Sequence, residues 1–406
     1  MAAPDKRILL IHQNFPGQFR HVAKAWVQTP GWDVVGVGRK AAPGMPGVRW
    51  LGYDLHREPL KEQHHYLRTM ESAVLHGQAV ARALLRLKGQ GWQPDVIVAH
   101  PGWGESLYVK DVFPSARLIH LCEWYYGTAD ADTGFDPAFP ADLDGMARQR
   151  TWNALHLLNL EQCDVGVSPT AWQRSRHPAR YQDKIELIHE GVDTELMAPD
   201  ANAALTLPDG RVLRPGDPVV TFVARNLEPY RGFHVFMRSL VHLQRLHPTC
   251  QVVILGGDDV SYGGRPKDAP CWREKMLAEL PELDLDRIHL MGKLPYLSYR
   301  TVLQVSAAHV YLTYPFVLSW SMLEAMSAGC LVVGSRTAPV QEVIDDGVNG
   351  LLVDFFDEPA LAARVAQALH EPGLYRAMRT RARDTICQHY SLAAGTAGYT
   401  RLLTST

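Results

Sequence analysis

The sequence has no strong excess of one charge and no long hydrophobic run. Its 406 residues include 41 Lys and Arg and 43 Asp and Glu, giving a formal net charge of −2 at pH 7. Without a basic footprint, we expect no nucleic-acid partner. No segment approaches the roughly 18 unbroken apolar residues that a membrane span needs, and the first apolar run, ILLI, is too short for a secretory signal. We therefore expect a cytoplasmic protein, which leaves peripheral contact with the cytoplasmic face of a membrane open.

Cysteine is also scarce, with six residues and no CxxC pair. Dispersed cysteines in apolar stretches are typical of reduced core residues, and they argue against disulfides and zinc sites. Hydrophobic residues make up 46% and charged residues 21%, as in ordinary globular proteins. The length is about twice what one hydrophobic core organises, so we expect two domains.

Short runs rich in Val, Ile and Leu alternate with helical patterns, and the rhythm restarts near residue 218. Runs that are apolar on both faces and separated by helices favour parallel sheets. We therefore predict an α/β protein with two Rossmann-like domains in tandem, a linker over 195–218 and a ligand cleft between the domains. The predicted strands are 7–12, 32–38, 95–100, 116–122, 164–168 and 184–189, then 218–224, 250–257, 287–292, 309–314, 330–335 and 350–354.

A loop with two arginines follows the first strand of the second series. In VARNLEPYRGFHVFMRSLVHL, residues 223–243, Arg225 and Arg231 precede an amphipathic helix that begins near Gly232. Cations beside the free N–H groups of a helix N-terminus suit a phosphate or diphosphate. The alternative is a pair of ordinary surface arginines.

A single carboxylate interrupts the apolar segment LTYPFVLSWSMLEAMSAGC, residues 312–330. Ser319 is a candidate N-cap for a helix that passes through Glu324 and ends at Gly329. A carboxylate in that helix can accept two hydroxyl hydrogen bonds, which suits a vicinal diol such as a ribose. The alternative is an exposed helical glutamate.

Together these segments resemble a known family. VARNLEPYRG, LMGKLP, the stretch from YPFVLSWSMLEAMSAGC to VNGLLVD, and HEGVDTELMAP are similar to the family 4 (group 1) glycosyltransferases of GT-B fold. The resemblance is strong over about 160–370 and weaker, but in order, over the N-terminal half. It implies domains at 1–197 (acceptor side) and 198–385 (nucleotide-sugar side), with a C-terminal helix within 386–406 that packs back on the first domain.

The resemblance implies a nucleotide-sugar site in the second domain. Arg225 matches the family arginine, and Arg231 stands where the family usually has lysine; both would hold the donor diphosphate. Glu324 matches the second Glu of the family's Glu-x7-Glu motif, which binds the ribose. Phe316 replaces the first Glu, so the usual contact with the transferred sugar is lost or supplied elsewhere.

Further donor contacts are implied for the helix N-terminus at Ser319 and Trp320, and for the nucleotide base at Lys293 and Leu294. In the first domain, Gly17 belongs to a turn in which the backbone would approach the donor phosphates closely. No metal or cofactor is expected; the acidic loop with Asp130 and Asp132 lacks the full calcium pattern.

Two strand ends of the first domain carry candidate catalytic residues. His100 ends one predicted strand, and Trp103 in the following turn would either stack on a sugar or pack as an ordinary indole. Glu123 ends the next strand, where relatives have a histidine, with His120 as the alternative. Either would contact the donor or help to take the acceptor proton.

The sequence therefore predicts a glycosyltransferase that moves a sugar from a nucleotide-diphosphate donor to a hydroxyl acceptor on a glycan, lipid-linked molecule or other glycoconjugate. The family implies retention at the anomeric carbon. A GT-B sugar phosphorylase or epimerase, or a catalytically silent nucleotide-binding relative, are the alternatives. The oligomeric state is not predicted.

Overall fold

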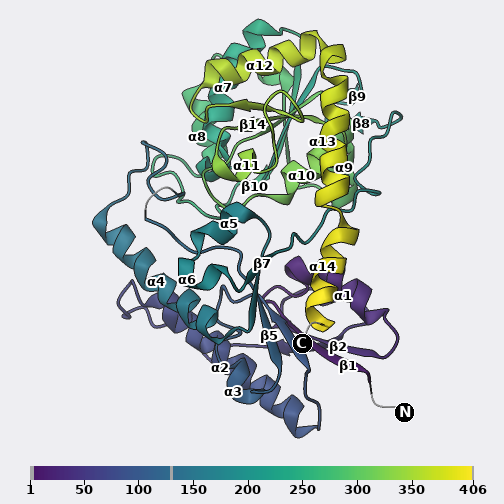
Figure 1. The fold of residues 1–406 in the computed structure, drawn as a ribbon. Coiled ribbons are helices and arrows are strands. Elements are labelled where there is room, and N and C mark those ends of the chain that lie inside the picture. Colours follow the sequence, from purple (N-terminus) through teal and green to yellow (C-terminus); the bar gives the residue numbers. More distant parts are fainter. Residues whose placement is uncertain (1–3, 129–130, 405–406) are drawn as a thin grey trace. The chain divides into compact units, whose positions relative to one another are not determined.

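The computed structural model describes residues 4–128 and 131–404 and divides into two compact units. The first comprises Met1–Gly191 with Leu392–Thr406, and the second comprises Val192–Ser391. Figure 1 shows the elements of each unit along the chain. Among the described residues, no helix combines the length and apolar character needed to cross a membrane.

Seven parallel strands form the sheet of the first unit, in the order β3-β2-β1-β4-β5-β6-β7. The order reverses between β1 and β4, so ligands are expected beyond the carboxyl ends of these two strands. The strands are β1 (Lys6–Ile11), β2 (Trp32–Arg39), β3 (Arg49–Tyr53), β4 (Val96–Ala99), β5 (Arg117–Leu121), β6 (Val165–Ser168) and β7 (Ile185–Leu187).

Alternate residues of β1 enter two different cores. Ile8 and Leu10 belong to one buried cluster, and Leu9 and Ile11 belong to another. Burial on both faces explains why this strand reads as a continuous apolar run. The helices of the unit are η1 (Gly17–Phe19), α1 (Arg20–Val27), α2 (Arg68–Gly89), α3 (Val109–Val112), α4 (Leu143–Gln162), α5 (Ala171–Arg176), α6 (Ala179–Gln182) and α14 (Leu392–Thr404).

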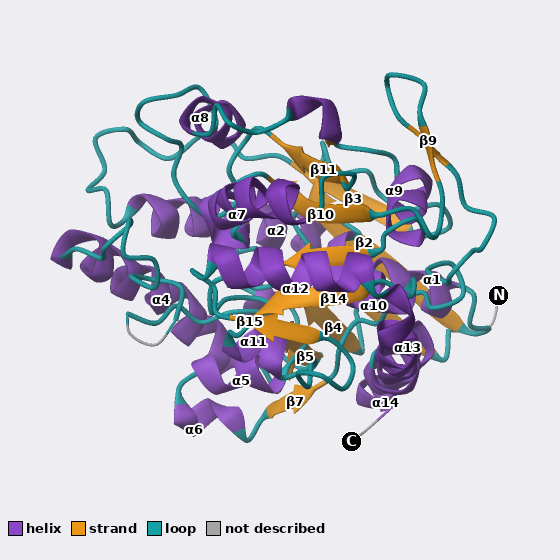
Figure 2. Ribbon diagram, turned by 90° about the horizontal axis from the view of Figure 1, so that it is seen from above, coloured by secondary structure: helices purple, strands orange, loops and turns teal. Residues whose placement is uncertain are grey.

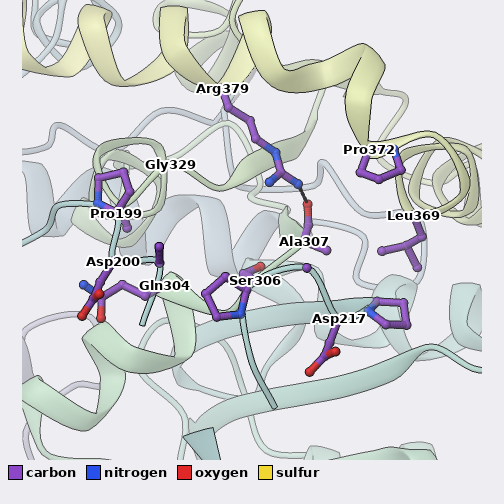
Figure 3. Close-up of a pocket in the computed structure, with 15 residues that line it drawn as sticks. Pro199, Asp200, Asp217, Gln304, Ser306, Ala307, Gly329, Leu369, Pro372 and Arg379 are labelled. Carbon is purple, nitrogen blue, oxygen red and sulfur yellow. Dashed lines mark hydrogen bonds between the residues drawn. The ribbon is translucent and has the colours of Figure 1, made fainter. Parts of the chain in front are cut away.

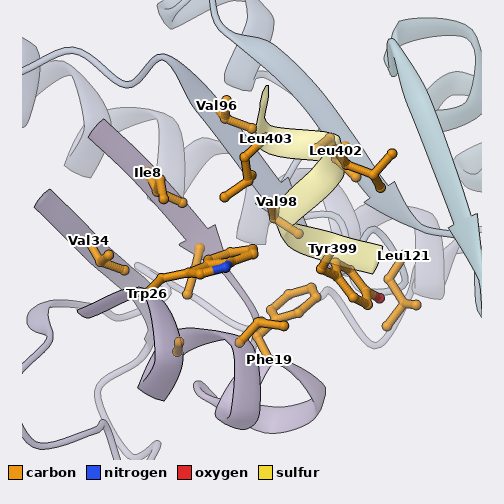
Figure 4. Close-up of a cluster of buried hydrophobic side chains, with 14 of the residues drawn as sticks. Ile8, Phe19, Trp26, Val34, Val96, Val98, Leu121, Tyr399, Leu402 and Leu403 are labelled. Carbon is orange, nitrogen blue, oxygen red and sulfur yellow. The ribbon is translucent and has the colours of Figure 1, made fainter. Parts of the chain in front are cut away.

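The last helix of the chain, α14, completes the core of the first unit. Tyr399, Leu402 and Leu403 lie in the same buried cluster as Phe19 and Trp26 (Figure 4). The Trp26 indole N–H also donates to the Thr400 hydroxyl at 2.9 Å. Segments from the two ends of the sequence therefore share one core.

Six parallel strands form the main sheet of the second unit, in the order β12-β11-β10-β13-β14-β15. A small antiparallel pair, β8 with β9, stands apart from it. The strands are β8 (Leu205–Thr206), β9 (Val212–Leu213), β10 (Val219–Asn226), β11 (Gln251–Gly257), β12 (Ile288–Gly292), β13 (Ala308–Tyr311), β14 (Leu331–Ser335) and β15 (Leu351–Val353).

Helices cover this second sheet, and α7 and α12 lie side by side against it (Figure 2). Gly232, with φ +68°, precedes α7, and a side chain there would overlap Leu312. The helices are η2 (Pro229–Arg231), α7 (Phe233–Leu246), α8 (Trp272–Glu279), η3 (Leu285–Arg287), α9 (Tyr296–Gln304), α10 (Trp320–Ser327), α11 (Ala338–Gln341), α12 (Glu358–His370), η4 (Pro372–Tyr375) and α13 (Arg376–His389).

Each predicted strand run overlaps a strand of the structure, but the linker prediction over 195–218 was wrong. Met197, Leu205 and Leu213 are buried in clusters of the second unit. The chain instead passes between the units at Gly191/Val192 and at Ser391/Leu392. The final helix α14 accordingly begins at Leu392, because the residues before it belong to α13 and pack with the second unit. The edge strand β3 was also missed, because most of its side chains are only partly buried.

Candidate functional site

The second unit carries most of the predicted nucleotide-sugar residues at one edge of its sheet. The strand order reverses between β10 and β13. Arg225 is the second-to-last residue of β10, Arg231 follows that strand, and Ser319 follows β13. In an open parallel sheet, this edge is where ligands bind.

Two cations at this edge are exposed. Arg225 and Lys293, which follows β12, make no hydrogen bond or ion pair with any described residue. The Lys293 side chain lies across Gly257 at the end of β11, where a Cβ would overlap it. The guanidinium and ammonium groups are therefore available to an anion such as a diphosphate.

Arg231 lies in a different environment, because its side chain is buried. Its Nη1 donates to the Thr313 hydroxyl at 2.8 Å, to the Val317 carbonyl at 2.9 Å and to the Tyr311 hydroxyl at 3.2 Å. These acceptors lie at the end of β13 and in the loop that leads to α10. Arg231 therefore orders the loop that precedes the Ser319 helix.

Phe316, at the position of the family's first Glu, packs beside Arg231. Its ring lies 5.9 Å from the guanidinium carbon and makes edge contacts with Tyr262 at 4.9 Å and Tyr230 at 5.5 Å. The ring is buried. Position 316 thus contributes packing around a buried cation and offers no acceptor for a sugar hydroxyl.

Glu324 is buried, and both of its carboxylate oxygens already accept hydrogen bonds. Tyr296 donates to Oε1 at 2.6 Å and Tyr299 donates to Oε2 at 2.7 Å. Burial and the neighbouring Glu324 raise the pKa of Tyr299 well above its usual value, so this phenol keeps its proton. Each carboxylate oxygen retains a second lone pair that can accept a further hydrogen bond. Of the residues that contact Glu324, Tyr296 is 39% exposed.

The start of α10 has the geometry expected from the sequence. The Ser319 hydroxyl accepts from the Ser321 N–H at 3.4 Å, and the Ser319 N–H donates to the Tyr311 hydroxyl at 2.8 Å. Trp320 is the first residue of the helix and is half-buried. The Leu294 side chain packs against the buried cluster that includes Leu205 of β8 and Leu213 of β9. Its backbone groups are therefore the part available to a nucleotide base.

In the first unit, Gly17 is required by a neighbouring ring. It has φ +48°, and a Cβ there would clash with the His12 imidazole. Glycine adopts this conformation without strain. His12 follows β1 and is buried, with its Nδ1 accepting the Asn14 N–H at 3.0 Å.

Glu123 and His100 lie together beside this turn. His100 Nε2 is 3.1 Å from Glu123 Oε2, and Gln18 Nε2 donates to Glu123 Oε1 at 3.1 Å. Gln18 Oε1 lies 2.6 Å from His12 Nε2. The four side chains form a hydrogen-bonded chain from His12 through Gln18 and Glu123 to His100, with 31% of the Glu123 side chain exposed.

The protonation states in this chain follow from its geometry. Burial and the neighbouring His100 lower the pKa of His12 to about 3, so His12 is neutral. Burial tends to raise the pKa of Glu123, but the hydrogen bonds from His100 and Gln18 outweigh it and lower the pKa. Glu123 is therefore an ionised, partly exposed hydrogen-bond acceptor.

The two alternatives left open, Glu123 and His120, differ in their position relative to β5. His120 lies inside β5 and is 1% exposed, and burial lowers its pKa to about 3. It therefore lies inside the core.

Trp103 stacks on His100 at 4.3 Å between ring centroids and meets His12 edge-on at 5.2 Å. Asp130 of the acidic loop lies outside the described residues.

A second, largely buried polar cluster lies next to this one. The Tyr53 hydroxyl donates to Glu105 Oε1 at 2.6 Å and lies 2.7 Å from His76 Nδ1, and Gln13 Nε2 donates to the same Glu105 oxygen at 3.2 Å. Burial raises the pKa of Glu105 and lowers that of His76 to about 4. Burial therefore disfavours the charged forms of both side chains.

A cavity of about 240 Å³ lies at the opposite edge of the second sheet (Figure 3). It is lined by Pro218 at the start of β10, by Ser306 and Ala307 before β13, and by Gly329 before β14. Arg379 donates to the Ala307 carbonyl beside it. These residues precede the strands, so the cavity is separate from the predicted donor residues.

Two family models match the chain in succession. Residues 30–197 match the glycosyl transferase family 4 group, and residues 208–385 match the glycosyl transferases group 1. The chain belongs to the group 1 glycosyltransferases. It is therefore a glycosyltransferase of the GT-B fold, with two Rossmann-like units.

Named relatives of this glycosyltransferase are distant. It is 24% identical to an alpha-maltose-1-phosphate synthase of Mycolicibacterium smegmatis over 69% of the chain and 76% of the relative. It is 28% identical to a GDP-mannose-dependent alpha-(1-6)-phosphatidylinositol monomannoside mannosyltransferase of the same organism, over 53% of the chain and 55% of that relative. The chain thus spans about half the length of the second relative.

Solved structures share the fold over nearly the whole glycosyltransferase. Sucrose-phosphate synthase from Thermosynechococcus elongatus matches with a TM-score of 0.71 at 16% identity, covering 98% of both chains. HepE from Anabaena, solved with UDP and glucose, matches with a TM-score of 0.69 at 14% identity, covering 99% of this chain and all of HepE.

Sequence reasoning missed four residues of the candidate site, which contact residues that were predicted. His12 and Gln18 lie within the predicted Gly17 turn, and the polar residues that flank a strand end were the available signal. Tyr296 and Tyr299 lie on one helix three residues apart, which places them on one face. Their contact with Glu324 joins segments distant in the sequence, and no local pattern reveals it.

Proposed function

We propose that this enzyme transfers a sugar from a nucleoside-diphosphate sugar to a hydroxyl of a glycan, lipid-linked or other glycoconjugate acceptor, with retention at the anomeric carbon. The observation that carries the proposal is that two exposed cations, Arg225 of β10 and Lys293 after β12, lie at the carboxyl ends of strands of the second sheet. An exposed cation pair at this edge suits the diphosphate of such a donor.

The proposed roles follow from the environments of the side chains. Arg225, together with Lys293, neutralises the diphosphate as it leaves, which stabilises charge that develops in the transition state. The buried Arg231 acts on the donor mainly through the loop that it orders. Glu324 binds the ribose with its free lone pairs while Tyr299 holds it in place. Lys293 and Leu294 border the base.

In the first unit, Glu123 is proposed to accept a hydroxyl of the sugar or of the acceptor, and His100 to orient it. Gly17 is proposed to give the phosphates close access to the backbone. No metal is proposed, and Arg225 and Lys293 are proposed to balance the diphosphate charge. The proposed location is the cytoplasm, with the acceptor deciding whether the protein meets a membrane surface.

The neighbours suggest which donors to try first. HepE was solved with UDP and glucose and also with UDP-glucose, and one relative is named as GDP-mannose-dependent. UDP-glucose and GDP-mannose are therefore the first candidate donors. Because Phe316 replaces the usual sugar-binding carboxylate, the sugar itself must be tested over a panel.

A catalytically silent nucleotide-binding protein is the second candidate. It is favoured by the buried Phe316 and by the two tyrosine hydroxyls that already donate hydrogen bonds to Glu324. The reaction products distinguish a sugar phosphorylase or epimerase of the same fold from a glycosyltransferase.

The test is a turnover assay with a panel of nucleotide sugars, with and without glycan and lipid-linked acceptors. We expect release of a nucleoside diphosphate that accelerates with one acceptor and yields a glycosylated product. Turnover of a free sugar phosphate would favour a phosphorylase. Nucleotide binding with no release from any donor would favour the silent protein.

A further inference from the structure

Three side chains donate hydrogen bonds to Glu123. Gln18 and His100 each donate to one of its two oxygens, and Gln173 donates to its backbone carbonyl at 2.8 Å. These donors come from η1, from the segment after β4 and from α5. The carboxylate and the backbone carbonyl of Glu123 are therefore both fixed by segments that are distant in the sequence.

The direction of each hydrogen bond in the chain is set by backbone N–H groups. The Gly102 N–H donates to His100 Nδ1 at 3.1 Å, so the proton of a neutral His100 lies on Nε2 and points at Glu123. The Asn14 N–H donates to His12 Nδ1 in the same way, so His12 Nε2 donates to Gln18 Oε1. The Gln18 amide then has only one orientation, with its N–H toward Glu123.

His12 is tied to the site by packing as well. Gly17 leaves room for the imidazole, and the rings of Trp103 and His100 lie against it. Both nitrogens of this ring bond elsewhere than Glu123, since Nε2 donates to Gln18 and Nδ1 accepts from Asn14. The hydrogen bond to Gln18 instead fixes the amide that donates to Glu123.

We propose that His12 and Gln18 are positioning residues, which hold the Glu123 carboxylate so that its exposed side accepts a hydrogen bond from a sugar hydroxyl. The inference rests on the proposed function for the identity of that hydroxyl. Neither residue reacts: His12 orients Gln18, and Gln18 orients Glu123. A carboxylate held in this way loses little orientational freedom when the substrate binds.

Within the described part of the chain, three titratable groups interact electrostatically with Glu123. They are His100 after β4, His12 after β1, and Tyr399 of α14. Besides burial, the charge of Glu123 contributes to raising the pKa of Tyr399. Removing the Gln18 amide takes away one donor and leaves these groups in place, so the Glu123 pKa must rise.

The test compares Gln18→Leu and His12→Phe with the wild type, using nucleoside diphosphate release from UDP-glucose and GDP-mannose. We expect kcat to fall by roughly 10- to 100-fold with little change in KM, and the acid limb of the pH–rate profile to move to higher pH in Gln18→Leu. His12→Gln, which keeps an N–H donor, should retain more activity than His12→Phe. Gln182→Leu is the matched control, since the only described groups to which Gln182 donates are the Ser175 and His177 carbonyls.

A second readout needs no substrate. The titration of the Glu123 carboxyl carbon, followed by ¹³C NMR and assigned by its loss in Glu123→Gln, should move to higher pH in Gln18→Leu. Unchanged titration together with a kcat within twofold of the wild type would overturn the inference. If the wild type turns over no nucleotide sugar, the proposed function fails, and the NMR titration alone then decides whether Gln18 sets the state of Glu123.

Discussion

Arg225 and Arg231 belong to one loop but differ in what surrounds them. Arg225 is exposed and meets no described partner, whereas Arg231 is buried against a carbonyl and two hydroxyls. Removing an exposed side chain usually changes stability by no more than about 0.5 kcal/mol. Removing a buried donor leaves its acceptors unsatisfied, and hydrogen bonds to charged groups contribute about 1.5–3 kcal/mol each. The two arginines should therefore respond differently to mutation.

We expect Arg225→Ala to weaken nucleoside diphosphate binding by about tenfold or more while the melting temperature stays near that of the wild type. Arg231→Ala should instead destabilise the second unit by roughly 2–4 kcal/mol. Calorimetric titration with UDP and GDP, paired with thermal unfolding, separates the two. A large loss of stability in Arg225→Ala, or none in Arg231→Ala, would contradict these environments.

Glu105 gives a prediction about pH. Burial raises its pKa in the folded state, so the folded protein holds the proton more tightly than the unfolded chain does. The stability linked to this group is complete below the unfolded pKa and is lost as the pH rises through the folded pKa.

Glu105→Gln has nearly the same shape and does not ionise. We expect it to melt at a higher temperature than the wild type at pH 8, with the difference shrinking toward pH 5. Thermal unfolding of both proteins between pH 5 and pH 8 measures this. A difference that is constant across that range would mean that Glu105 does not titrate as its burial requires. Exposed Glu62→Gln serves as the matched control.

At the scale of elements, α14 is the part of the chain whose role is least visible from its neighbours in sequence. It follows a helix of the second unit but packs in the core of the first, beside Trp26 and Phe19 (Figure 4). Tyr399 is 1% exposed there, and its hydroxyl has no hydrogen-bond partner among the described residues.

We expect Tyr399→Ala to cost roughly 3–5 kcal/mol, the range for truncating a large buried aromatic side chain. Tyr399→Phe should be neutral or slightly stabilising, because it removes only an unpaired polar group. Arg401→Ala on the same helix breaks an exposed ion pair with Glu186 and should change stability by less than about 1 kcal/mol. Thermal unfolding checks all three, and equal costs for Tyr399→Ala and Arg401→Ala would show that α14 does not anchor the first unit.

At the scale of the whole molecule, the sequence was most informative where strands are buried on both faces. Ile8 to Ile11 form an unbroken apolar run because neighbouring residues enter opposite cores. Val252 to Leu255 form a similar run that is buried throughout, so both sheets could be predicted. The edge strand β3 and the β8–β9 pair were missed because they are short or only partly buried. The segment 195–218 was misread as a linker because its prolines and glycines suggested a loop, while its buried Leu205 and Leu213 were too sparse to show a pattern.

The candidate site was predictable where single residues follow strands and less so where contacts join distant segments. Glu123 and His100 were found at strand ends, and the structure brings them together. The burial of Arg231, the phenols on Glu324 and the His12–Gln18 link depend on tertiary contacts. Such contacts leave no signature within a local stretch of sequence.

Binding of nucleoside diphosphates to the wild type and to Glu324→Ala tests the central claim most directly. A ligand that binds only the folded state raises the melting temperature, so a panel including UDP and GDP can be screened by thermal shift and then titrated by calorimetry. We expect one nucleotide to stabilise the wild type and to bind Glu324→Ala more weakly. If no nucleotide binds, or if Glu324→Ala binds with unchanged affinity, the nucleotide-sugar site does not lie at this edge of the second sheet.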